Sequence, residues 1–87
     1  TVIDPCDAHE IEQAVPVIAD HRGPVYMRLL RGQVPLVLDE YGYRFEIGKA
    51  KVIRDGTDVL VISSGLLTMR TLEAAAKLAA DKVSVAV

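Results

Sequence analysis

The chain has 87 residues, of which 51% are hydrophobic and 25% charged, and a formal net charge of −2 at pH 7. A chain of this length builds one small core, and its charge leaves no polybasic surface, so we expect no nucleic-acid partner. A single cysteine excludes an internal disulfide and a site with several thiolate ligands. No apolar run reaches the roughly 18 to 20 residues of a membrane-spanning helix, and no signal-peptide pattern is present. We therefore expect a cytoplasmic protein without membrane contact.

The first helix is predicted to begin at Asp7. Asp7 and Glu10 have the spacing of a capping box, in which Asp7 accepts from the backbone of the first turn and Glu10 reaches back. Pro16 interrupts the helical pattern because it lacks a backbone donor, so we expect a kink or a second short helix there, ending near Arg22-Gly23. The predicted apolar face consists of Ile11, Ala14, Val15, Ile18 and Ala19. Outside this face fall Glu10, Gln13 and Asp20.

A strand is predicted next, over Pro24–Leu30, after a turn at Gly23. The pattern then becomes irregular, and Pro35 blocks regular pairing. We interpret residues 33–48 as a linker between two domains. A free tether would be polar, whereas this segment contains several apolar residues, so we expect it to lie packed along a surface.

The second half of the chain reads as strand, turn, strand, helix and strand. Residues 50–54 form the first strand, Asp55-Gly56 signals a hairpin turn, and residues 58–63 form a strand buried on both faces. A helix over about Leu66–Ala80 leads to a last strand at 83–87, which is parallel to strand 58–63 if the crossover is right-handed.

Within this second helix, an apolar stripe is expected to face the sheet. Its members are Met69, Leu72, Ala76 and Ala79. Glu73 and Lys77 are spaced for an ion pair, and Ser64 is expected to cap the helix.

The fold class is therefore α/β. Residues 1–32 are interpreted as the end of one α/β domain, and the linker 33–48 joins them to residues 49–87, the first half of an open, largely parallel α/β domain. Because the sequence stops inside a predicted strand, we expect it to be a piece of a longer protein.

Two arginines, Arg28 and Arg31, lie near the carboxyl end of the first predicted strand. Ligands bind at this end of open α/β sheets, and a planar guanidinium holds two oxygens of a phosphate or carboxylate. Side chains three residues apart point to opposite faces of a strand, so we favour Arg31, beside Gly32, as the residue that faces a cleft. The alternative is a salt bridge from Arg31 to Asp39 or Glu40.

The remaining candidate groups have structural interpretations. His9 and His21 have no partners at metal-ligand or triad spacing, so both are predicted at the surface. No nearby His or Lys supports Cys6 as a nucleophile, so it is predicted to be inert. The aromatic residues Tyr26, Tyr41, Tyr43 and Phe45 are assigned to packing that anchors the linker.

Three segments together resemble the transketolase family of thiamine-diphosphate enzymes: Gly23–Gly32, Tyr43–Ala50 and Asp55–Gly65. By this resemblance, residues 1–32 are similar to the end of a pyrimidine-binding domain and residues 43–87 to the first half of the carboxyl-terminal domain. The separately encoded carboxyl-terminal subunit of split transketolases is the best match. The resemblance implies that Arg31, with Arg28 beside it, contacts the phosphate of a sugar-phosphate substrate.

The resemblance further implies transfer of a two-carbon ketol unit between sugar phosphates, with thiamine diphosphate and Mg²⁺ in the complete enzyme. The family's cofactor glutamate and metal motif lie in other segments. We therefore expect this chain alone to bind no cofactor and to be inactive, and to depend on a cofactor-binding partner domain or subunit in a homo- or hetero-oligomer.

Other identities stay open at this point. The segments Gly48-Lys49-Ala50 and Gly56–Val59 also resemble β subunits of 2-oxoacid dehydrogenases, and deoxyxylulose-phosphate synthase is similar as well. A non-catalytic module that holds subunits together, or a small α/β binding protein acting by itself, are the alternatives of another class.

Overall fold

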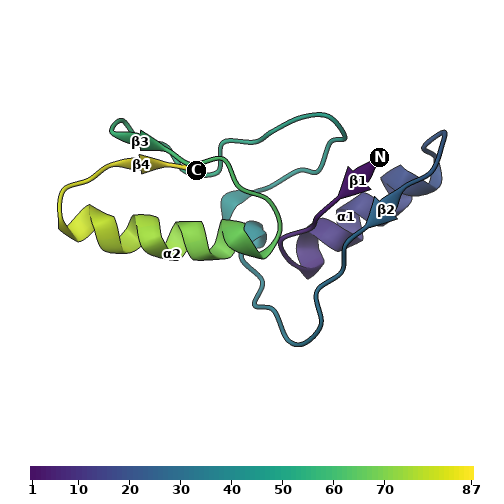
Figure 1. Ribbon diagram of the computed structural model, residues 1–87, viewed down its shortest axis with the longest axis horizontal. Helices are drawn as coiled ribbons and strands as arrows, with labels where there is room; N and C mark the ends of the chain where they lie inside the picture. The colour runs from purple at the N-terminus through teal and green to yellow at the C-terminus, as the bar shows by residue number, and fades with distance from the viewer.

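Two short parallel sheets organise the chain (Figure 1). The computed structural model describes residues 1–87, and each sheet pairs two strands across one helix in a βαβ unit. The amino-terminal lobe contains β1 (Val2–Ile3), α1 (Ala8–Ala19) and β2 (Tyr26–Met27). The carboxyl-terminal lobe contains β3 (Val59–Leu60), α2 (Leu66–Ala80) and β4 (Val85–Ala86). The predicted α/β class with parallel strands is confirmed. The domain boundaries at 32 and 48 stay a prediction.

Helix α1 begins as predicted, because the Asp7 side chain accepts from the Glu10 backbone at 3.0 Å. Glu10 reaches back, but its Oε2 accepts from Cys6 N at 2.8 Å. The expected second helix is wrong, since α1 runs through Pro16 and ends at Ala19. Glu12 and Pro16 are both exposed, so water can reach the Glu12 carbonyl that Pro16 leaves without a donor.

The buried face of α1 is narrower than predicted. Ala14 is fully buried, while Ile11 and Ile18 are half-buried. Val15 and Ala19 are exposed, because the two-stranded sheet beside α1 covers only one narrow strip of the helix.

Strand β2 is much shorter than the predicted Pro24–Leu30. The ladder consists of the β1–β2 pairing, extended by hydrogen bonds from Tyr26 N to Thr1 O at 2.9 Å and from Arg28 N to Ile3 O at 2.8 Å. Beyond Ile3 the chain turns at Asp4-Pro5 toward α1, so β1 offers β2 no further partners and the ladder ends at Arg28. Arg31 therefore lies in a loop, and the argument that placed it on one face of a strand does not apply.

Strand β4 has hydrogen-bond partners on both of its sides. One side pairs with β3, while Val87 on the other side exchanges hydrogen bonds with Ile53 and Arg54. The hairpin predicted at Asp55-Gly56 is therefore wrong, because its two arms flank β4 and do not pair with each other. Gly56 crosses so close to β4 that an added Cβ would lie 2.2 Å from the Ala86 nitrogen. Position 56 therefore needs a residue without a side chain, because the backbone of β4 passes directly beside it.

Helix α2 has the predicted bounds and covers one side of the second sheet (Figure 1). The core consists of Leu72, Ala75, Val85 and Val87, with Val37, Ile53, Val61 and Val83 packed against it. The predicted stripe is right at Leu72 and wrong at Ala76 and Ala79, which are exposed. Thr68 and Ala75 are buried in their place.

Two further expectations for this lobe fail. Glu73 and Lys77 form no ion pair, and both side chains extend into solvent. The ion pairs of the structure are His9–Asp39 and Lys49–Glu46. Strand β3 is not buried on both faces: Leu60 is 65% exposed and Ile62, just beyond it, 85%. α2 shields one face of the sheet, and no other element of these residues covers the opposite face.

The connection between the lobes is packed around η1 and largely exposed elsewhere, so the prediction of a packed linker holds only in part. It contains a short 3₁₀ helix, η1 (Leu38–Tyr41), which ends at Gly42 with a left-handed φ of 58°. Leu38 is 2% exposed and Val37 packs against the core of the carboxyl-terminal lobe, whereas Leu36 remains exposed.

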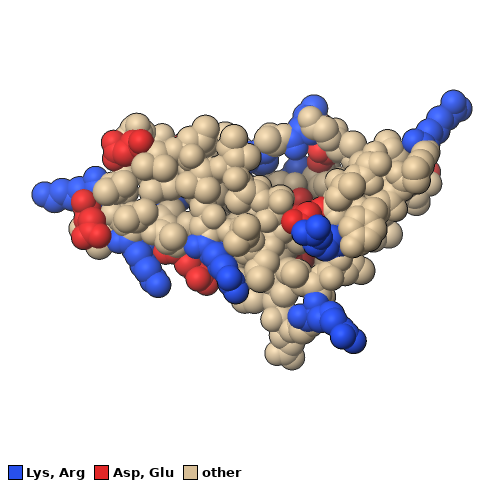
Figure 2. Space-filling model, viewed as in Figure 1, with Lys and Arg blue, Asp and Glu red and all other residues tan.

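The surface carries charges of both signs. Figure 2 shows Lys and Arg projecting singly from several points of the outline, without gathering into one patch on this face. No helix of the structure combines the length and the apolar character needed to cross a membrane.

Gly56→Ala is expected to destabilise the full protein by about 3 kcal/mol or more, because backbone atoms of β4 cannot yield to the added methyl group as a side chain would. Gly42→Ala is the control: its Cβ meets open space, so only the left-handed strain of about 1 to 2 kcal/mol applies. Urea unfolding of both variants measures the difference. An equal loss in the two would contradict the close approach at β4.

Candidate functional site

The loop between β2 and η1 carries both predicted site arginines, and Figure 1 shows it reaching out from the body of the molecule. Arg28 and Arg31 are exposed, and neither forms an ion pair. The alternative salt bridge from Arg31 to Asp39 or Glu40 is therefore not formed. Asp39 lies instead 4.0 Å from His9.

A hollow of about 700 Å³ lies between this loop and the start of α1. Arg28 lines the hollow, whereas Arg31 lies outside its wall, farther along the loop. The other loop residues of the wall are Leu30, Gly32, Gln33, Val34 and Pro35. Arg28 is the one cation of the wall, and the preference for Arg31 as the residue facing a cleft has no support in this geometry. The substrate-binding role of either arginine stays a prediction.

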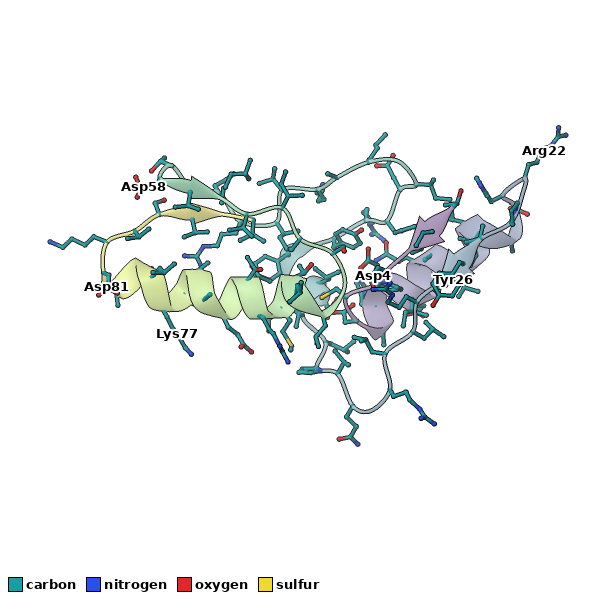
Figure 3. All side chains as sticks on the ribbon, viewed as in Figure 1. Asp4, Arg22, Tyr26, Asp58, Lys77 and Asp81 are labelled. Carbon is teal, nitrogen blue, oxygen red and sulfur yellow. The ribbon has the colours of Figure 1, made fainter.

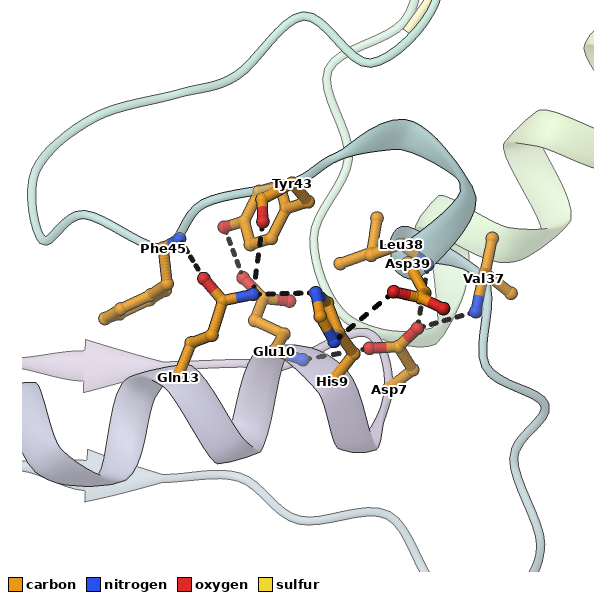
Figure 4. A network of polar contacts seen from close by, with 9 residues as sticks. All are labelled: Asp7, His9, Glu10, Gln13, Val37, Leu38, Asp39, Tyr43 and Phe45. Carbon is orange, nitrogen blue, oxygen red and sulfur yellow. Dashed lines mark hydrogen bonds and ion pairs between the residues drawn. The ribbon is translucent and has the colours of Figure 1, made fainter.

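The Asp7 carboxylate ties this loop to α1 (Figure 4). Its Oδ2 accepts from Val37 N at 2.7 Å and from Leu38 N at 2.9 Å, and its Oδ1 accepts from Glu10 N at 3.0 Å. Asp7 is only 2% exposed. Burial by itself raises the pKa of Asp7, but the hydrogen bonds from Leu38, Val37 and Glu10 outweigh it, so the pKa lies below its usual value. The carboxylate is held charged.

The polar face of α1 binds the chain beyond η1. Glu10 Oε1 accepts from the Tyr43 hydroxyl at 2.7 Å, which, together with burial, raises the pKa of Tyr43. Gln13 donates to Tyr43 O at 3.1 Å and accepts from Phe45 N at 3.0 Å. Figure 4 shows these side chains pointing together toward residues 43–45.

The sequence interpretation missed this role of the polar face. Glu10 and Gln13 fall outside the predicted apolar face, and apart from the capping role of Glu10 the sequence indicated no partner for either side chain. The one available signal was that an irregular segment without its own pairing must find acceptors and donors for its backbone elsewhere.

The histidines are less exposed than predicted. His9 is half-buried, with its Nε2 2.8 Å from Gln13 Nε2. His21, also half-buried, has its Nε2 3.0 Å from the Thr1 hydroxyl. The surface prediction is therefore wrong for both, because each ring occupies a contact with another part of the amino-terminal lobe. The packing role predicted for the aromatic residues holds for Tyr43, whereas Tyr26 is 60% exposed.

Asp4 lies where the two lobes meet (Figure 3). Its Oδ2 accepts from the Ser64 hydroxyl at 3.2 Å, and an added Cβ on Gly65 would lie 2.6 Å from the same oxygen. The predicted capping of α2 by Ser64 is wrong: Gly65 is the N-cap, and no side chain caps the helix. A second hollow, of about 530 Å³, opens between the lobes beside this contact.

Cys6 is buried at the start of α1, 2% exposed. Burial, aided by the negative charges of Asp7 and Glu10, raises the pKa of the thiol to about 11, against a smaller opposing effect of a hydrogen bond with the Met69 backbone. The thiol is protonated at neutral pH, which agrees with the expected inertness.

The two βαβ units define an α/β protein, and the comparisons identify its family. Residues 48–87 match the family described as transketolase, C-terminal domain. A transketolase family protein of Sinorhizobium fredii is 78% identical over 78 residues, which cover 90% of this chain and 23% of that protein. A 6-deoxy-6-sulfo-D-fructose transketolase subunit of a Clostridium strain is 37% identical over 83 residues, covering 95% of this chain and 26% of that protein.

A solved structure agrees with these relatives. It is described as an inactive β4 tetramer of a split-gene transketolase and matches with a TM-score of 0.87 at 38% identity, over 98% of this chain and 29% of that chain. The chain belongs to the transketolase family and corresponds to part of its carboxyl-terminal section. It spans about a quarter of the length of the curated relatives it matches.

Acid is expected to remove the stability that Asp7 contributes. Because the folded pKa lies below the unfolded value of about 3.9, this contribution is complete above that value and is lost as the pH falls through the folded pKa. In Asp7→Asn, the free energy of unfolding should therefore fall less steeply between about pH 5 and pH 2 than in the unaltered protein. Denaturant titrations over this range measure the slope, with Asp20→Asn as control. Parallel curves for the Asp7 variant and the unaltered protein would contradict the carboxylate's role.

Cys6 is expected to resist alkylation in the folded protein. At pH 8 its raised pKa leaves about one thiolate in a thousand thiols, and burial restricts access further. Mass spectrometry of the Cys6 peptide after iodoacetamide should show labelling at least about a hundredfold slower than in urea. Comparable rates in the two conditions would show that the thiol is accessible and activated.

Proposed function

We propose that these residues are part of a thiamine-diphosphate-dependent enzyme that transfers a two-carbon ketol unit between sugar phosphates. Membership of the transketolase family supports the reaction class. The observation that carries the proposal is that two exposed arginines, Arg28 and Arg31, form no ion pair. They lie on the loop beside the hollow at α1. Two permanent cations without a carboxylate partner are suited to a dianionic phosphate.

The proposed roles divide between the two arginines. Arg28, in the wall of the hollow, binds the terminal anion of the sugar, and Arg31 extends the same positive field along the loop. The relative named as a 6-deoxy-6-sulfo-D-fructose transketolase subunit supports a substrate with a terminal anion, because a sulfo sugar carries one in place of phosphate.

The three carboxylates of this chain that are not exposed are already bound within it. Asp7 and Glu10 each accept two or more hydrogen bonds within the chain, and Asp4 is bound by Ser64. No three of its Asp, Glu, His and Cys side chains gather as metal ligands. We therefore assign thiamine diphosphate and Mg²⁺ to a partner domain or subunit, and we expect residues 1–87 alone to be inactive.

Assembly and location belong to the same proposal. The solved relative is described as a β4 tetramer, which supports a homo- or hetero-oligomer here. The match that begins at residue 48 supports a carboxyl-terminal domain after the linker, with residues 1–32 as the end of the pyrimidine-binding domain. A cytoplasmic location is part of this proposal.

A role confined to holding subunits together is the second candidate. Leu60 and Ile62 favour it, because they are 65% and 85% exposed on the uncovered side of the second sheet. Such a module would be indifferent to sugar phosphates, so the substrate dependence of the arginine variants separates the two candidates.

Arg28→Ala and Arg31→Ala, made in the full protein assembled with its partner and cofactor, test the proposal. Loss of a hydrogen bond to a charged group costs about 1.5 to 3 kcal/mol, so KM for the sugar phosphate should rise roughly 10- to 100-fold in at least one variant. The kcat should change less than about twofold, because the terminal phosphate is remote from the reacting carbons.

Arg22→Ala is the matched control, since Arg22 is exposed and projects from the tip of the turn after α1 (Figure 3). Its KM should equal that of the unaltered enzyme. Unchanged KM values in both loop variants would overturn the substrate role and favour the assembly module.

A further inference from the structure

The arginine loop, residues 28–37, is fixed only at its two ends. At one end Arg28 N donates to Ile3 O at 2.8 Å, and at the other Val37 N donates to Asp7 Oδ2 at 2.7 Å. The residues between them, 29–36, make no hydrogen bond with any part of the chain. Leu29 and Leu36 are 59% and 58% exposed, so packing holds this stretch weakly. The path of the loop therefore depends on where its ends are held.

Both ends are held by the first seven residues of the chain. Ile3 belongs to β1, and Asp7 is the N-cap of α1 four residues later. The same short segment also contributes Pro5 and Cys6 to the wall of the hollow that Arg28 lines. Anchors, hollow and loop thus form one local unit.

Asp7 supplies the anchor with side-chain atoms, and only a carboxylate meets its requirements. Three backbone N–H groups converge on its two oxygens, from Glu10, Val37 and Leu38. An asparagine has one acceptor oxygen, and its NH₂ group would face an N–H donor. A serine satisfies the helix but has no second oxygen for the linker.

We propose that Asp7 is a positioning residue: by holding Val37 and Leu38 against the start of α1, its carboxylate closes the loop, restricts the path of residues 29–36 and so sets where Arg31 lies relative to Arg28 and the hollow. The kinetic consequence rests on the proposed function, whereas the tether does not. If the Val37 end is released, the loop adopts a wider set of conformations. Substrate binding must then offset the conformational entropy lost when the loop becomes ordered. Small displacements of binding groups weaken recognition strongly.

Asp7→Ser in the assembled holoenzyme isolates the tether. Serine can still accept from the Glu10 backbone, so α1 retains its start, while the linker loses its acceptor. We expect the Val37 and Leu38 amides to exchange hydrogen at least about tenfold faster. KM for the sugar phosphate should rise about five- to tenfold, with kcat within about twofold.

A double-mutant cycle distinguishes positioning from general destabilisation. If Asp7 acts through the arginines, Asp7→Ser should add little to KM in the Arg28→Ala/Arg31→Ala background, whereas independent effects would multiply. Asp20→Ser, at the other end of α1, is the matched control and should change neither exchange at Val37 and Leu38 nor KM. Multiplying effects in the cycle would overturn the proposal.

The two proposals fail in different ways. If the arginine variants leave KM unchanged, the proposed substrate role is wrong, and amide exchange in Asp7→Ser still judges the tether. If Asp7→Ser does not fold, exchange in the unaltered protein decides: the Val37 and Leu38 amides should exchange more slowly than those of Gly32 and Gln33. Equal rates at the four amides would overturn the inference.

Discussion

One buried carboxylate organises the amino-terminal half of this structure. Asp7 is almost inaccessible to water, yet it stays charged because three backbone donors replace the hydration it has lost. Those donors come from two places far apart in sequence, the first turn of α1 and the beginning of η1. A buried N–H without an acceptor is unfavourable, so satisfying the helix and satisfying the linker become a single requirement. The position of the linker, the shape of the hollow and the exit of the arginine loop all follow from it.

The rest of the molecule is lightly packed. Only 12 of the 87 residues are buried, and the two lobes extend over 45 Å with separate two-stranded sheets. Two strands with one helix bury little apolar surface. Polar contacts therefore hold many of the segments in place here. Glu10 and Gln13 fasten the segment after η1 to α1: Glu10 accepts from the Tyr43 hydroxyl, and Gln13 binds backbone groups of Tyr43 and Phe45. Such a small core suits a section of a larger transketolase-type enzyme. One apolar face of its second sheet, at Leu60 and Ile62, is left uncovered by these residues.

Local patterns predicted much of the fold and little of the site's connectivity. The capping box located the start of α1, and the turn at Ser64-Gly65 with the helical apolar stripe after it located α2, because these signals depend on residues a few positions apart. The parallel pairing of β3 and β4 followed from the crossover rule. The predictions that failed concern contacts between residues far apart in the sequence. The Asp55-Gly56 pair has the local pattern of a hairpin turn. Its glycine is needed because the backbone of β4, 30 residues later in the chain, lies too close for a side chain at this position. Likewise, β2 ends early because its partner β1 turns away after Ile3, and the polar face of α1 binds a segment whose own sequence has no regular pattern.

The contact at Asp4 has a mechanical implication. Helix α2 lacks a capping side chain from its own lobe, and the negative charge nearest its positive dipole end belongs to the β1–α1 connection of the other lobe. If the lobes rotated apart, the first turn of α2 would lose that favourable charge. The contact therefore favours one mutual orientation of the two lobes, which neither βαβ unit would impose by itself.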